Sequence, residues 1–373
     1  MYTRVGFLPG VGWGSSMCER SGAFTDVNPP KVTVLMSVYN GEAYLKASVQ
    51  SVLEQTFRDF EFLVIDDGSS DGSLSILQDI HDDRVRVVQN AQNLGLIRSL
   101  NKGIGLARGE YIARHDCDDL MVRERLAHQV VYMDEHPEVV LAGTWMQLID
   151  ESDNPVDEWC NPPSDLEIRW SSLFNAAVSH PSAMYRTQLA RTLKGYSSDS
   201  IYAEDFDLWS RMAEHGKVAN LPAILEWYRI HGESVSKKNE ERQLATRFAV
   251  ASRNIAKVVG PEFFHPALME LIIQTRMPKG LAELNSLVRG YQQLVQAFEA
   301  QYVVAVALSD WIRWDIVERL STSFQHVGWA GRMAALLLNV GAFPAAFWFR
   351  GRFLSFVMSH ELKRSLARRL GRE

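Results

Sequence analysis

The sequence predicts an α/β protein with a mostly parallel central sheet, helices on the sheet, and a helical C-terminal extension. In the first half of the chain, short apolar runs rich in β-branched residues alternate with stretches that have apolar residues at helical spacing. Strands and helices that alternate in this way form βαβ units with parallel strands. After Ser236 the patterns are helical, which predicts the extension.

The expected elements follow from these patterns in order. Apolar runs that end in turn-forming or polar residues predict strands at 32–38, 62–65, 85–88, 111–114 and 139–146. Helical spacing between them predicts helices at 45–53, 73–80, 96–107 and 123–135. A further helix is expected to start within 202–209, and the extension is expected to form helices at 240–259, 268–274 and, in pieces, 280–319.

Composition limits the classes of function. A chain of 373 residues has room for about two domains, and its net charge of −6 gives no reason to expect a nucleic-acid partner. Three widely separated cysteines, and a start without the pattern of a secretory signal, favour the cytoplasm. We expect a flexible arm at 1–30, an α/β domain at 31–236 and a helical region at 237–373.

An acidic cluster follows the strand at 111–114. Asp116, Asp118 and Asp119 crowd the carboxyl end of that strand, where open α/β sheets bind ligands. Neighbouring carboxylates raise one another's pKa, and a hard divalent cation offsets their repulsion. The cluster therefore predicts a metal site, with an acidic turn that caps the next helix as the alternative.

The turn after the first strand excludes two common nucleotide sites. Residues 37–42 read Ser-Val-Tyr-Asn-Gly-Glu, which is neither a G-x-G-x-x-G fingerprint nor a P-loop. A metal held by carboxylates is the other way to neutralise a diphosphate. Tyr39 offers a ring to a base or packs at the strand end, and Asp67 accepts a base N–H or forms a turn.

Three runs, at 32–41, 64–69 and 109–119, together resemble the family 2 glycosyltransferases, and the likeness extends over about 31–235. The resemblance implies inverting enzymes of the nucleotide-sugar-binding fold called GT-A, with 31–236 as the catalytic domain. It implies a nucleotide-sugar donor and a hydroxyl acceptor on a glycan or a lipid-linked saccharide, as in bacterial cell-surface polysaccharide synthesis. A UDP-sugar is the favoured donor and a dTDP-sugar the second.

The resemblance also implies roles for individual residues near the donor. Ser37, Tyr39 and Asp67 line the nucleoside pocket, and the acidic cluster holds the ribose and a Mn²⁺ or Mg²⁺ ion. Within the cluster, we assign Asp118 and Asp119 to the metal and Asp116 to the donor.

In the second part of the domain, the acidic pair Glu204 and Asp205 opens a helix, where carboxylates also suit the helix dipole. The resemblance makes Asp205 the catalytic base, and Glu204 then orients the site or the acceptor. It makes His231 a metal ligand or diphosphate contact, while Arg229 pairs with phosphate or braces the sheet. It places an acceptor-side strand at 175–184, with His180 near the sugar or acceptor.

The C-terminal region has two interpretations. Residues 333–349 carry no formal charge and include several aromatic side chains, and a basic tail follows them. This pattern favours contact with an anionic membrane surface, which would place the protein on the inner face of the membrane. The alternative is a helical subdomain that contacts the α/β domain.

Three other functions would leave different features in the sequence. A sugar-nucleotide pyrophosphorylase needs a Gly-rich basic loop after the first strand, which 37–42 lacks. A non-catalytic nucleotide- or glycan-binding module would show a broken acidic motif, and a scaffold would use the helical region to recruit partners.

We expect Asp118, Asp205 and His231 to meet in one cleft.

Overall fold

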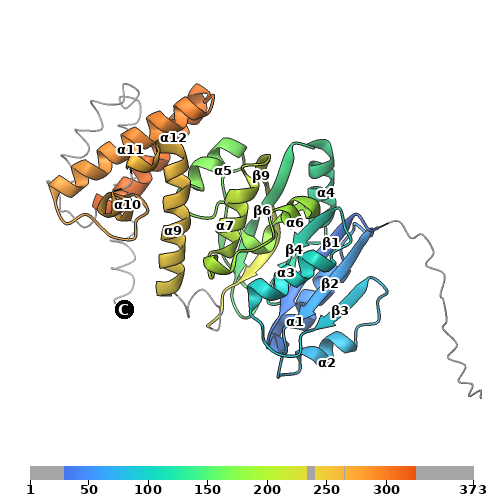
Figure 1. Ribbon diagram of the computed structural model, residues 1–373. Helices are drawn as coiled ribbons and strands as arrows, with labels where there is room; N and C mark the ends of the chain where they lie inside the picture. Colours follow the sequence, from blue (N-terminus) through green and yellow to red (C-terminus); the bar gives the residue numbers. More distant parts are fainter. Residues whose placement is uncertain (1–28, 233–239, 264, 325–373) are drawn as a thin grey trace, which may run out of the picture.

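The computed structural model describes residues 29–232, 240–263 and 265–324. Figure 1 shows an α/β body followed by an array of helices at one end of the molecule. The expectations for the arm, apart from its last two residues, and for the segment 333–349 with its basic tail lie outside the described residues.

One sheet forms the centre of the described α/β body. Its strand order is β3-β2-β1-β4-β8-β6-β9-β5, and β7 pairs with β6. The strands are β1 Val32–Val38, β2 Phe60–Asp66, β3 Val85–Gln89, β4 Tyr111–Arg114, β5 Leu120–Met121, β6 Val139–Ile149, β7 Pro155–Trp159, β8 Met184–Arg186 and β9 Lys217–Arg229.

Strand direction explains why distant segments meet at one edge. The first four strands in space, β3, β2, β1 and β4, pair in parallel, as the sequence predicts. Strand β8 is antiparallel to both β4 and β6, and β9 is parallel to β6, so the second half of the sheet is mixed. Because β8 is antiparallel to both of its neighbours, β6 runs in the same direction as β4. Strand β9 is parallel to β6 and therefore also runs in the direction of β4. The end of β9 therefore lies toward the loop that follows β4.

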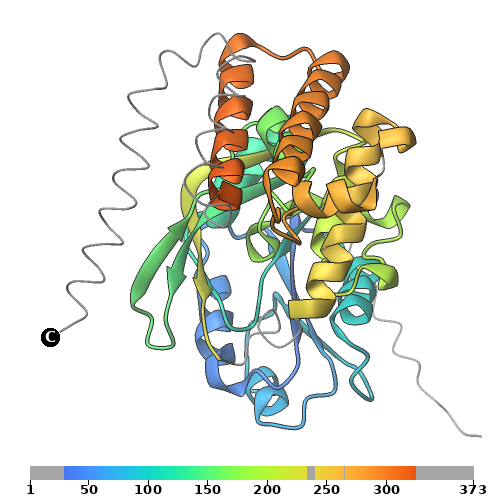
Figure 2. The ribbon, with the colours of Figure 1, turned by 90° about the vertical axis from the view of Figure 1, so that its left-hand side faces the viewer.

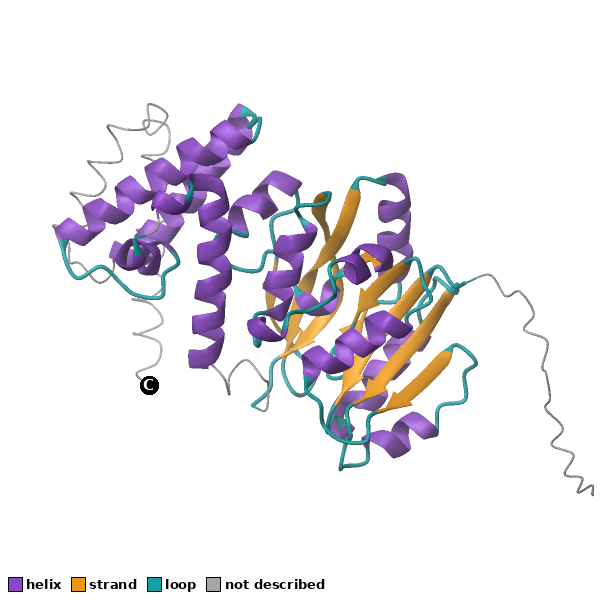
Figure 3. Ribbon diagram, viewed as in Figure 1, coloured by secondary structure: helices purple, strands orange, loops and turns teal. Residues whose placement is uncertain are grey.

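Helices cover both faces of the sheet (Figure 3). They are α1 Glu42–Leu53, α2 Ser73–Gln78, α3 Leu96–Leu106, α4 Arg125–Glu135, α5 Asp165–Ser171, α6 Thr187–Thr192 and α7 Glu204–Met212. The strand expected at 175–184 is wrong, because a 3₁₀ turn occupies His180–Ser182 and strand β8 begins only at Met184. Pro181 has no N–H to donate to a sheet ladder, which accounts for the interruption.

The two faces of the sheet bury separate apolar clusters. Val34 and Met36 of β1 point toward α1 and α4, whereas Leu35 points toward α3 and α7. Every residue of β1 is buried, so its apolar run is continuous and does not alternate.

The described part of the extension consists of α9 Glu240–Val259, α10 Pro266–Ile272, α11 Leu281–Gln301 and α12 Val306–Phe324. Both Figure 1 and Figure 2 show the helices after α9 at the end of the molecule remote from β3. Their apolar side chains share one cluster with Trp170, Phe174 and Phe206 of the α/β body. The Trp170 indole also donates a 2.7 Å hydrogen bond to Asp315 of α12. Helices 240–324 therefore contact the α/β body, which agrees with the subdomain alternative. Within the described ranges, no helix combines the length and apolar character that a membrane crossing requires.

A buried polar network lies beneath the loop after β4. The carboxylate of Glu226 on β9 contacts the His115 ring at 2.7 Å and the Arg125 guanidinium at 2.6 Å, and all three side chains are fully buried. His115 also contacts Ser48 of α1, and Arg125 donates to the carbonyl of Arg114 at 2.9 Å. The network thus joins α1, α4 and β9 to the end of β4.

Glu226→Ala should destabilise the protein strongly, because it leaves the Arg125 charge buried without a counter-ion. We expect the free energy of unfolding to fall by about 3–5 kcal/mol in urea denaturation. Glu110→Ala is the control, since Glu110 pairs with Lys31 on the surface and should cost less than about 1 kcal/mol. Equal losses in the two variants would contradict the role of the network.

Candidate active site

Three carboxylates converge in the loop after β4. Oxygens of Asp116, Asp118 and Asp119 lie within 4.8 Å of one another. Asp119 is fully buried; its Oδ1 accepts the Arg229 backbone N–H at 2.8 Å, whereas its Oδ2 has no hydrogen-bond partner among the described residues. Burial, and then the neighbouring Asp118 and Asp116 carboxylates, raise the pKa of Asp119 well above its usual value. Clustered hard oxygen donors, one of them without a partner, fit a divalent cation.

The end of β9 supplies the other side of this loop. His231 Nε2 lies 2.8 Å from Asp118 Oδ2, and this hydrogen bond is the main cause that raises the pKa of His231. Arg229 Nε donates to the Asp118 carbonyl at 2.9 Å, and the guanidinium lies over the Tyr44 ring. The Arg229 side chain is only 2% exposed and pairs with Asp153. Its geometry fits the bracing alternative better than a phosphate contact.

The acidic pair of α7 faces a cavity. Tyr202 has a positive φ of 70°, an uncommon conformation for a residue other than glycine, and the chain then enters the helix at Glu204. Asp205 Oδ1 accepts the Phe206 N–H at 2.7 Å. Burial raises the pKa of Asp205 to about 6 and, together with the Asp205 charge, raises that of Glu204 to about 7. These values place both groups in a range suited to proton transfer near neutral pH.

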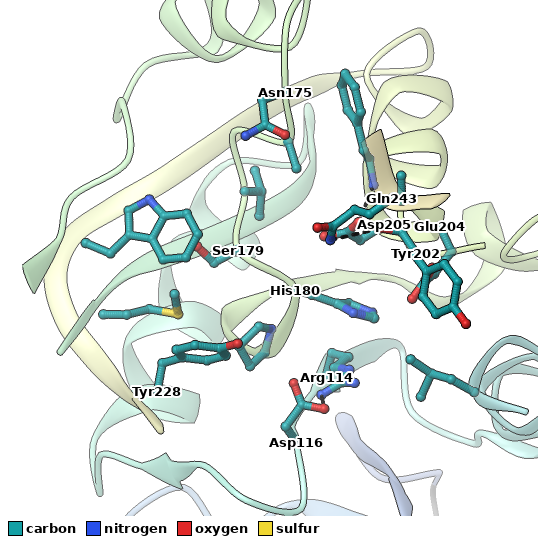
Figure 4. Close-up of a pocket in the computed structure, with 18 of the residues that line it drawn as sticks. Arg114, Asp116, Asn175, Ser179, His180, Tyr202, Glu204, Asp205, Tyr228 and Gln243 are labelled. Carbon is teal, nitrogen blue, oxygen red and sulfur yellow. Dashed lines mark hydrogen bonds and ion pairs between the residues drawn. The ribbon is translucent and has the colours of Figure 1, made fainter. Parts of the chain in front are cut away.

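One cavity of about 460 Å³ connects the acidic loop to α7. Asp116 and Asp118 line one end, and Glu204 and Asp205 line another part, as Figure 4 shows for Asp116, Glu204 and Asp205. Its wall also includes Trp159, Asn175, Ser179, His180, Tyr202, Tyr228, Gln243 and Arg247. Asp118 and Asp205 line this cavity, whereas His231 is not among its lining residues and contacts Asp118. The roles of these residues remain predictions.

The expected nucleoside residues lie along the neighbouring strand ends. Ser37 is near the end of β1, and Tyr39 just beyond it is 49% exposed. The Asp67 carboxylate accepts hydrogen bonds from Asn90 and from the backbone N–H groups of Leu94 and Gly95. These contacts support the turn alternative for Asp67, although a carboxylate has about four acceptor sites and three are used. None of the three expected residues lines the cavity described above.

Several cavity residues escape the sequence analysis. Arg114 is almost fully buried and forms an ion pair with Asp116, and its charge offsets part of the rise that burial gives the pKa of Glu204 and Asp205. The sequence could have indicated Arg114 as a site residue, because Arg114 ends the strand that precedes the acidic cluster. Gln243, from α9, donates to the Tyr202 carbonyl at 3.2 Å. No sequence pattern links α9 to α7, so this contact needs the tertiary structure.

His180 lies in the middle of the cavity wall in Figure 4. Its Nε2 contacts the Tyr196 hydroxyl at 2.9 Å, and burial holds its pKa well below the usual value, so the ring is neutral. Cys117 is a thiol and not a thiolate, because burial raises its pKa well above the ordinary value.

Comparisons with known proteins agree with this architecture. Residues 33–193 match the family described as Glycosyl transferase family 2. An uncharacterized glycosyltransferase of Haemophilus influenzae is 33% identical over 239 residues, which cover 61% of this chain and 74% of the relative. The UDP-Glc:alpha-D-GlcNAc-diphosphoundecaprenol beta-1,3-glucosyltransferase WfaP of Escherichia coli is 28% identical over 63% of this chain and 88% of its own length. The crystal structure of S. aureus TarS 1–349 in complex with UDP-GlcNAc superposes with a TM-score of 0.52 at 17% identity, over 79% of this chain and 89% of that one.

The chain therefore belongs to glycosyltransferase family 2, and it is a glycosyltransferase with the GT-A fold. The expected family and fold are both confirmed.

Asp119→Asn should stabilise the metal-free protein, because the neutral amide is not subject to the burial and carboxylate repulsion that raise the pKa of Asp119. In EDTA near pH 7 we expect the melting temperature to rise by about 2–4 °C, the shift that about 1 kcal/mol gives in a domain of this size. Added Mn²⁺ should raise the melting temperature of the wild type more than that of the variant. Asp83→Asn, an exposed acid remote from the site, is the control; the same shifts there would refute the assignment.

Proposed function

We propose that the protein transfers a sugar from a nucleoside-diphosphate donor to a hydroxyl group of a glycan or lipid-linked saccharide, with inversion, in the synthesis of a surface polysaccharide. The observation that carries the proposal is the shared cavity: the carboxylate cluster lies at one end and the buried Asp205 carboxylate lies on another wall. Donor neutralisation and proton removal are the two tasks that such a transfer needs.

On the donor side, Asp118 and Asp119 would hold Mn²⁺ or Mg²⁺, with Asp116 and His231 beside them. A bound cation would neutralise the diphosphate that leaves. Ser37, Tyr39 and Asp67 border the nucleoside, and Tyr39 has the exposed ring that base stacking requires. A UDP-sugar is the favoured donor, which agrees with the donor in the name of the E. coli relative.

On the acceptor side, Asp205 removes the proton from the attacking hydroxyl. Its raised pKa makes the carboxylate a stronger base than a surface aspartate. Glu204 orients the site, and the neutral His180 offers a hydrogen bond without adding charge. The hydroxyl attacks the face of the sugar opposite to the diphosphate, so a single displacement inverts the anomeric carbon.

The acceptor and the location follow from the same reasoning. A relative whose name gives a diphosphoundecaprenol-linked acceptor supports a lipid-linked saccharide here. Such an acceptor places the enzyme on the cytoplasmic side of the membrane, as a peripheral protein.

A donor screen tests the proposal directly. Purified protein with Mn²⁺ or Mg²⁺ should release a nucleoside diphosphate from one of a panel of UDP-, dTDP- and GDP-sugars, and EDTA should abolish the release. A pyrophosphorylase would instead release pyrophosphate from a nucleoside triphosphate and a sugar phosphate. A non-catalytic module would bind a nucleotide without turnover.

Asp205→Asn should lower kcat about 10²–10⁴-fold, because the variant has no carboxylate to accept the proton. Donor affinity measured by calorimetry should be unchanged. Asp199→Asn, an exposed acid in the preceding turn, is the matched control. Full activity of Asp205→Asn would remove Asp205 from the role of base.

The pH profile separates the two acids of α7. A base acts when deprotonated, so kcat/KM should fall as the pH drops through the pKa of the responsible group. With Asp205 as the base, the midpoint of the kcat/KM profile should lie near the Asp205 pKa of about 6. Glu204→Gln should leave this midpoint unchanged. A midpoint near 7, the value for Glu204, that disappears in Glu204→Gln would assign the base to Glu204.

A further inference from the structure

Helix α9 closes part of the cavity that the α/β body leaves open. Two of its side chains, Gln243 and Arg247, line the cavity and lie four residues apart, on one face of the helix. Gln243 donates to the Tyr202 carbonyl, and Figure 4 shows it beside Glu204 and Asp205. This face of α9 therefore borders the cavity on the side of the proposed base.

Arg247 is a cation without a counter-ion among the described residues. Its Nε is buried and has no hydrogen-bond partner there, and no carboxylate of the described residues is among the charges that act on the Arg247 guanidinium. Burial, and then the charge of Arg319, lower the pKa of the Arg247 guanidinium. By contrast, Arg253 on the same helix pairs with Asp207. A partly buried guanidinium that lines a cavity without a partner is unfavourable in the free protein, which points to an anionic ligand.

We propose that Arg247 binds a phosphate group of the acceptor. The inference rests on the proposed function, because it uses the opposed positions of acceptor and donor in an inverting displacement. The donor diphosphate belongs at the acidic loop, near Asp118 and His231. An anion on the side of Asp205 therefore arrives with the acceptor, as the diphosphate of a lipid-linked saccharide would.

The chemistry of the side chain suits this ligand. A guanidinium presents parallel N–H groups that match two phosphate oxygens, and it holds its charge when partly buried. Gln243, one turn earlier, keeps the Tyr202 segment against α9, so the anion site and the base hold a fixed separation. Arg247 would thus select acceptors that carry phosphate next to the sugar whose hydroxyl attacks the donor.

The experiment uses the full chain with Mn²⁺ and a saturating amount of the nucleoside diphosphate that the donor screen identifies. Geranyl diphosphate is the probe, geraniol is the uncharged comparison, and calorimetry measures affinity. Arg247→Gln should weaken geranyl diphosphate binding about tenfold or more, the loss expected for a charged hydrogen-bonding pair. Affinity for the nucleoside diphosphate should stay at the wild-type value. Arg242→Gln, an exposed arginine on the same helix, should bind as the wild type does.

The outcomes separate the sources of phosphate. Weaker nucleoside diphosphate binding in Arg247→Gln would assign Arg247 to the donor and overturn the proposal, as would unchanged geranyl diphosphate binding. If Arg247→Gln lowers the melting temperature, Arg247→Lys replaces it in the test. Lysine keeps the positive charge but lacks the parallel N–H groups of the guanidinium, so this variant should bind geranyl diphosphate with intermediate affinity. A wild type that turns over no donor would instead refute the proposed function itself.

Discussion

The buried carboxylate of Glu226 is the contact on which the site depends. It holds His115, which directly precedes the acidic cluster, and Arg125, which also binds the carbonyl of Arg114. Breaking such a pair costs about 3–5 kcal/mol, a large part of the 5–15 kcal/mol that stabilises a typical domain. The network therefore couples strand β9, helix α4 and the end of β4, and it supports the loop that carries the acidic cluster.

Around the cavity, some buried charged and polar groups have no partner nearby. Arg114 forms an ion pair with Asp116 and the His231 ring hydrogen-bonds Asp118, whereas one oxygen of Asp119 has no partner among the described residues. On the far side, the described part of the chain gives Arg247 no counter-ion. The cavity thus has Asp116 and Asp118 at one end, and Arg247 lines it together with Glu204 and Asp205.

The helices after the α/β body are part of this arrangement. Trp170 and Phe174 share an apolar cluster with them, and the indole of Trp170 binds Asp315. Docking of α9 along α7 places Gln243 against the backbone of Tyr202, next to the acidic pair. The extension therefore shapes the part of the cavity that holds Glu204 and Asp205, as well as adding buried surface.

The sequence by itself determined the parallel strands β1 to β4, most of the helices and the acidic cluster. These features depend on local periodicity and on chemistry within a few residues, and the matched runs indicated the family. Short strands such as β5 and β8, the partners of Glu226, and the approach of Arg247 to the cavity were decided by the tertiary structure. The physical reason is that β8 and α9 act through contacts between distant segments. The ion pairs and hydrogen bonds of charged side chains form only when those distant segments pack together.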